Sequence, residues 1–126
     1  MASNRPTSAE LLEAVGGFLK AEVLPLLSGN HKYHLQVALN ALAILGREMG
    51  SAAQFDQAER ARLSALLKVE GTLEELNRVL CLKIRDRQLT YRDPQLLDHL
   101  MHTAMAKMAI DNPKYATYTR ARNGLG

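Results

Sequence analysis

"LQVALNALAIL", residues 35–45, decides the fold class because it places apolar side chains on almost every side of the helix that it predicts. Leucine and alanine dominate this stretch, and both favour helix over strand. A helix with so little polar surface is normally packed on several sides by other elements. We therefore expect an all-α, single-domain bundle of about five helices, with a central apolar second helix over about residues 31–49.

Two more helices are expected next to this central one. The sequence "TSAE" at residues 7–10 is a capping box, in which a threonine hydroxyl and a glutamate carboxylate satisfy each other's backbone N–H groups. It predicts the start of a first helix, which Pro25 should end or kink because proline lacks a backbone N–H. "GS" at residues 50–51 then separates the central helix from a third, over about residues 53–67.

Two further helix starts follow along the chain. Thr72 and Glu75 form a second capping box, which predicts a fourth helix over about residues 73–87. "RDP" at residues 92–94 supplies an aspartate N-cap and a proline at the first helical position of a fifth helix, which should reach about residue 110. The fifth helix is expected to turn these side chains inward: Leu97, Leu100, Met101, Ala104, Met105 and Met108.

Length and composition exclude several classes of protein. The chain has 126 residues, 47% of them hydrophobic and 5% aromatic, which suits one domain with an aliphatic core. Its one cysteine, Cys81, excludes an internal disulfide and fits the reducing cytoplasm; we expect it beside the core. No run reaches the roughly 18 apolar residues of a membrane span. The net charge is +3, but acidic and basic residues alternate, so we expect no nucleic-acid partner.

The chain divides into three parts by its sequence pattern. Residues 1–6 form an N-terminal arm, residues 7–112 the helical domain, and residues 113–126 a tail without apolar periodicity. We expect this tail to be flexible or to be ordered by a partner. Tyr115 and Tyr118 are the candidate partner contacts within it.

The four histidines form two pairs, "HKYH" at residues 31–34 and "HLMH" at residues 99–102. Histidines three apart can share a metal ion, but a stable site needs three or four ligands, and no Glu-x-x-His accompanies them. Asp98 could join His102 in a weak surface site. We expect solvent-facing histidines with no shared site, and no metal.

Catalytic motifs are also missing from the sequence, which contains no glycine-rich phosphate loop, no Gly-x-Ser-x-Gly and no HExxH. We therefore expect no catalytic residue and no cofactor. Two polar residues interrupt apolar faces, Glu22 in the first helix and Asn40 in the second. Both should be buried with hydrogen-bond partners, and Lys107 is the preferred partner of Glu22. Such groups form either a structural network or the lining of a ligand pocket.

Five segments carry a resemblance that covers residues 5 to 115: "RPTSAELLEAV", "FLKAEVLPLLSG", "VALNALAILGRE", "RDPQLL" and "KMAIDNPKY". Together they resemble a family of small bacterial all-helical domains of unknown function, encoded beside or fused to aminoglycoside-phosphotransferase-like kinases and acyl-CoA dehydrogenases. The resemblance implies no established activity. It adds Asp111 and Asn112 to a candidate polar cluster with Glu22, Asn40 and Lys107. Gln36 departs from the family pattern, which has arginine there.

Two functions follow as hypotheses. The first is a non-enzymatic accessory or docking domain of a phosphotransferase and acyl-CoA dehydrogenase pathway, which binds a protein partner and forms a homodimer. The alternative is a binding protein or enzyme component for an acyl or phosphorylated metabolite, with a polar pocket around Glu22, Asn40 and Lys107. An exposed apolar face would favour the first function, and a cavity with convergent polar groups the second.

Overall fold

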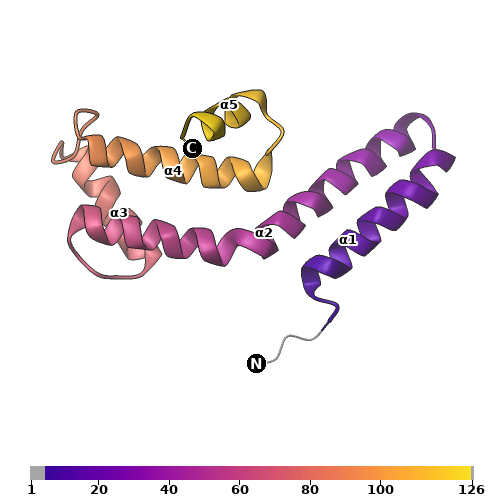
Figure 1. Cartoon of the computed structure of the whole chain (residues 1–126), viewed down its shortest axis with the longest axis horizontal. Helices are drawn as coiled ribbons and strands as arrows, with labels where there is room; N and C mark the ends of the chain where they lie inside the picture. Colours follow the sequence, from indigo (N-terminus) through magenta and orange to yellow (C-terminus); the bar gives the residue numbers. More distant parts are fainter. Residues whose placement is uncertain (1–4, 126) are drawn as a thin grey trace. The chain divides into compact units, whose positions relative to one another are not determined.

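The computed structural model describes residues 5–125, which contain helices and no strand (Figure 1). The expected all-α class and the number of five α-helices are confirmed for this part of the chain. Most of the expected N-terminal arm, residues 1–4, lies outside the described residues, as does Gly126. The chain forms two compact units, Met1–Ala52 and Ala53–Gly126, which are described in turn.

The first unit is a helical hairpin. Helix α1, Ser8–Phe18, continues through a π-helical turn at Leu19–Val23 and a 3₁₀ turn at Leu24–Leu26. The chain then reverses at Gly29, whose φ of 59° suits glycine, and the first part of helix α2 runs back along α1 (Figure 1). Pro25 lies inside the 3₁₀ turn, so the predicted end of the first helix is confirmed.

The capping box at the start of α1 is also confirmed. The Thr7 hydroxyl accepts the Glu10 backbone N–H at 3.1 Å, and the Glu10 carboxylate accepts the Thr7 backbone N–H at 3.3 Å. That second bond, helped by the Thr7 hydroxyl and the Arg5 guanidinium, lowers the pKa of Glu10.

Helix α2, Gly29–Leu67, is one continuous helix of 39 residues, so the predicted break at residues 50–51 is wrong. A glycine inside a helix costs only about 1 kcal/mol relative to alanine. Gly50 has no positive φ, and good helix-forming residues flank it on both sides. The expected second and third helices are therefore one element.

The second unit holds the buried core. Helix α3, Leu73–Arg85, and helix α4, Pro94–Asp111, are both near their expected bounds. The core joins the end of α2 to these two helices through five leucines: Leu63, Leu67, Leu76, Leu80 and Leu96. Asn77 also ties α3 to α2, because its side-chain amide donates to the Glu59 carboxylate at 2.9 Å. Cys81 is exposed on α3, so its expected place beside the core is wrong.

The inward face of α4 differs from the expected one. Leu96 and His99 are buried, whereas Leu97, Leu100 and Met101 are each more than 40% exposed. Helix α4 carries apolar residues on both of these faces, so its sequence pattern could not select one. The exposed face is a continuous apolar stripe, because these three side chains lie within about one helical turn.

The C-terminal tail contains a helix that the sequence pattern did not predict. Helix α5, Ala116–Leu125, follows Pro113 and packs against α4. Tyr118 is buried and Tyr115 is 49% exposed, so only Tyr115 remains available as the expected partner contact. Among residues 116–124 of this helix, Tyr118 is the one buried residue, in agreement with the lack of apolar periodicity.

Candidate functional site

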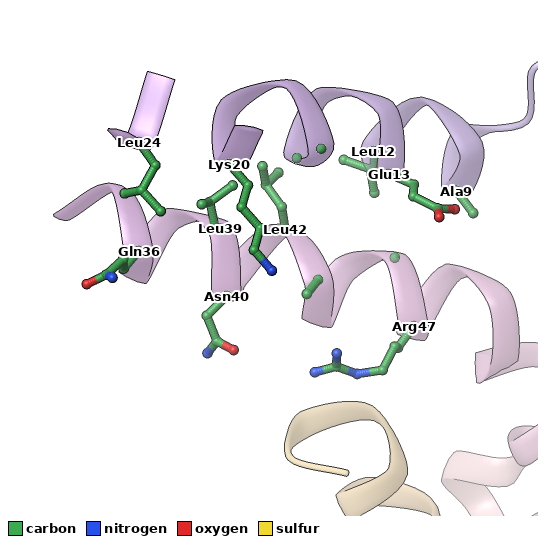
Figure 2. Close-up of a pocket in the computed structure, with 14 residues that line it drawn as sticks. Ala9, Leu12, Glu13, Lys20, Leu24, Gln36, Leu39, Asn40, Leu42 and Arg47 are labelled. Atoms are coloured by element: carbon green, nitrogen blue, oxygen red, sulfur yellow. The ribbon is translucent and has the colours of Figure 1, made fainter. Parts of the chain in front are cut away.

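A groove lies between α1 and α2 in the first unit and has a volume of about 660 Å³ (Figure 2). Its floor is apolar, with Leu12 and Leu24 from the first arm of the hairpin and Leu39 and Leu42 from α2. Such a lining suits an aliphatic group rather than a charged one.

Three glycines keep this groove open. Gly16, Gly17 and Gly46 line it, and a Cβ atom added at any of them would meet nothing within 4 Å. The glycines are therefore not needed for close contact between the two helices, which is a common reason for glycine at a helix interface. They leave unfilled space between α1 and α2 instead.

Polar side chains stand at the edges of the groove. Glu13 and Lys20 come from the first arm, and Gln36, Asn40 and Arg47 come from α2. In Figure 2 the Lys20 side chain extends from its own helix toward α2, whereas Asn40 and Arg47 extend away from α1. These groups do not converge on one point, so the groove lacks the arrangement expected of a catalytic centre.

Glu22 and Asn40 are both exposed, and the prediction that they are buried with partners is wrong. Neither side chain makes a hydrogen bond or ion pair within residues 5–125. The π-helical turn at Leu19–Val23 inserts an extra residue, which rotates Glu22 off the face that regular α-helical spacing assigns to it. In the first unit, moreover, the described residues form only the hairpin of α1 and α2 with its π-helical and 3₁₀ turns, which has no third α-helix of its own.

The expected polar cluster is not assembled within either unit. Asn40 lines the groove and Glu22 does not. Lys107, Asp111 and Asn112 are exposed and belong to the second unit.

The histidines have different surroundings. His31, His34 and His102 are exposed, as expected, and His102 Nδ1 lies 2.9 Å from the Asp98 backbone oxygen. His99 is only 3% exposed, so its predicted solvent-facing position is wrong. Within residues 5–125, no three side chains of His, Cys, Asp or Glu come together as a metal site would need.

His99 belongs to a cluster that the sequence did not reveal. Arg62 on α2 donates from Nε to His99 Nδ1 at 3.3 Å and from a terminal nitrogen to the Thr103 hydroxyl, also at 3.3 Å. Burial, and then the nearby Arg62 charge, lower the pKa of His99. No local pattern indicates this cluster, because its members are separated by 37 and 41 residues along the chain.

Comparison with known proteins identifies a family and no function. The family DUF6285, described as a domain of unknown function, matches residues 25–115. This is well over half of the chain, which therefore belongs to that family. No curated protein and no solved structure matches the chain. No helix of the described part is both long and apolar enough to cross a membrane.

Proposed function

We propose that this member of the DUF6285 family is a non-enzymatic helical accessory domain that docks onto protein through apolar side chains left exposed by its own fold. One observation supports this proposal above all others. In the first unit no described residue is buried, yet eight large apolar side chains are exposed: Leu11, Val15, Phe18, Leu26, Tyr33, Val37, Leu45 and Met49.

A two-helix hairpin with such a surface gains little from folding alone. Ordering each residue costs about 1–2 kcal/mol of backbone entropy, and fully burying a leucine or phenylalanine returns about 1.5–3 kcal/mol. Leu11, Val15 and Phe18 recur at helical spacing on one side of α1, and each is at least 50% exposed. A further surface that covers this stripe would supply the missing burial.

We infer that a second copy of this chain covers it. The stripe of Leu11, Val15 and Phe18 is apolar, and a two-fold axis would bring the same stripe of two copies together. Two hairpins related by a two-fold axis would form a four-helix arrangement, in which every helix gains a second neighbour. The protein would then be an isologous dimer through its first unit.

Light scattering of a variant pair tests the dimer. The wild-type chain should have a dimer mass at tens of micromolar, and Val15→Glu/Phe18→Glu should have a monomer mass because two buried carboxylates oppose the contact. Tyr91→Glu is the control, since Tyr91 is 73% exposed in the second unit. A monomeric wild-type chain, or a Tyr91→Glu variant that dissociates equally, would contradict the proposal.

The partner pathway is a finer part of the same proposal. The family resemblance suggests a cytoplasmic protein whose partner is an aminoglycoside-phosphotransferase-like kinase or an acyl-CoA dehydrogenase. The exposed stripe of Leu97, Leu100 and Met101 on α4 is the surface we assign to that partner. Purified kinase and dehydrogenase from the source cell should bind the wild-type chain, and Leu97→Asp/Met101→Asp should lose the binding. If neither enzyme binds, this assignment fails while the dimer stands.

The groove between α1 and α2 favours a second candidate function, the binding of an acyl group. Its leucine and glycine lining suits an aliphatic chain, and Lys20 stands at its edge. Of the three residues expected around a polar pocket, Asn40 lines this groove, and Glu22 and Lys107 do not. Binding of octanoate that Gly16→Leu abolishes, without a change in dimer mass, would favour this candidate over docking.

A further inference from the structure

A second open pocket, of about 500 Å³, lies within the second unit between α2 and the first turns of α4. Its apolar wall is formed by Ala65, Leu66 and Pro94. Its polar wall includes Arg62 and His99, which the docking function does not use. The pocket is separate from the α1–α2 groove, because all of its lining residues belong to the second unit.

Arg62 brings a positive charge to this pocket, and within residues 5–125 no carboxylate lies within ion-pair distance of it. Its two hydrogen bonds go to neutral acceptors, the His99 ring and the Thr103 hydroxyl. None of the ion pairs found in residues 5–125 includes Arg62, and it has no other polar contact there. A partly buried guanidinium is normally paired, because its desolvation is otherwise uncompensated. An anion in the pocket would supply that pair.

His99 holds the guanidinium in place and adds a donor. Arginine only donates hydrogen bonds, so His99 Nδ1 must be the acceptor, and the proton of the neutral ring lies on Nε2. The lowered pKa of His99 keeps the ring in this neutral form. Within residues 5–125, Arg62 is the only group that is hydrogen-bonded to the His99 ring, so Nε2–H has no partner in this part of the chain. Every fully enclosed side-chain nitrogen or oxygen in the same residues does have a partner. Nε2–H is therefore not fully enclosed by the described chain.

Two acidic groups restrict the anion that the pocket can hold. Asp98 lines the pocket with a largely exposed carboxylate, which lies 3.5 Å from His102 Nδ1. Glu59 is also near His99, but its carboxylate accepts from Asn77. A phosphate dianion would be repelled by Asp98, whereas a single carboxylate matches the planar fork of one arginine.

We propose that this pocket binds a small aliphatic monocarboxylate, with Arg62 on its carboxylate and Ala65, Leu66 and Pro94 around its alkyl group. Gln95 also lines the pocket and can donate its side-chain amide to the same carboxylate. This site is independent of the docking function, so either can fail without the other.

Butyrate is the probe for this site, followed by NMR of the Arg62 and His99 side-chain nitrogens in the full chain. Butyrate should shift both resonances saturably, with a Kd on the order of millimolar for so small a ligand. Butyramide, which lacks the charge, and inorganic phosphate should each bind at least about tenfold more weakly. Equal binding of butyrate and butyramide would overturn the proposal.

Two variants and one further ligand complete the test. Arg62→Gln should lose butyrate binding, while Arg60→Gln, an exposed arginine on the same helix, should keep it. Ala65→Leu narrows the pocket from an exposed position and leaves Arg62 in place, so it should weaken binding even if Arg62→Gln unfolds. Unchanged binding by Ala65→Leu would overturn the site. Binding of acetyl-Ala-Ala without binding of butyrate would also overturn the proposal. The pocket would then recognise the C-terminal carboxylate of a protein chain instead of a small monocarboxylate.

Discussion

Helices α1 and α3 begin alike and end up in different surroundings. Each starts after a threonine whose hydroxyl accepts a backbone N–H three residues later, and they have 11 and 13 residues. Yet α3 buries Leu76 and Leu80, whereas α1 buries no residue. In the second unit α4 adds Leu96 to the contact between α2 and α3, whereas the described residues of the first unit form no α-helix beyond the hairpin of α1 and α2. Local signals therefore form both helices, but only a third element makes a core.

Replacing one leucine in each unit with alanine should give the largest difference in the free energy of unfolding. Leu76 is 1% exposed and Leu11 is 52% exposed. Leu76→Ala should lower the free energy of unfolding by about 2–5 kcal/mol because it leaves a cavity in the core. Leu11→Ala should lower the free energy of unfolding by less than about 0.5 kcal/mol in dilute protein, as surface substitutions do. Urea denaturation of both variants measures this.

The leucine pair also tests the role of the second copy. If Leu11 is covered in a dimer, the cost of Leu11→Ala should grow with protein concentration, while that of Leu76→Ala should not. A cost of Leu11→Ala as large as that of Leu76→Ala in dilute protein would show that α1 is buried within one chain.

A smaller effect on stability should come from the titration of His99 in the second unit. The pKa of folded His99 lies below its usual value of 6.5, so the unfolded chain binds the proton more readily. The stability that neutral His99 contributes is complete above pH 6.5 and is lost as the pH falls from there toward the lowered pKa. His99→Gln should flatten this dependence in thermal unfolding, and His102→Gln, an exposed neighbour, should retain it. Equal slopes for the two variants would contradict the burial of His99.

The smallest effect is expected for two glutamates of the first unit. Glu22 and Glu13 are both exposed, so Glu22→Ala and Glu13→Ala should have nearly the same melting temperature. The sequence pattern alone predicts a much larger loss for Glu22→Ala. A clearly lower melting temperature for that variant would show that Glu22 has a partner in the assembled protein.

The sequence predicts those parts of the fold that depend on nearby residues. Thr7, Thr72 and Pro94 mark helix starts correctly, because capping depends on neighbours in the chain. The break at residues 50–51 is wrong, since a glycine without a nearby proline weakens a helix but does not end it. The inward face of α4 could not be chosen, because both faces carry apolar residues.

The candidate sites were harder to predict, because they depend on contacts between distant residues. Arg62 meets His99 and Thr103 across a separation of about forty residues, which no local spacing signals. The π-helical turn that moves Glu22 off its expected face is equally hidden, since regular spacing assumes 3.6 residues per turn. Asn40 lines the groove between α1 and α2, but the Glu22 and Lys107 side chains expected beside it do not.

Hydrogen exchange of the α1 and α3 amides, measured at tens of micromolar protein and again after hundredfold dilution, tests the central claim most directly. If a second copy covers the first unit, the α1 amides should be protected at the higher concentration and lose that protection on dilution, because dissociation exposes the hairpin. The α3 amides should exchange equally slowly at both concentrations. Protection of α1 that equals that of α3 and does not change on dilution would contradict the claim, since it would mean that the hairpin is stable within a single chain.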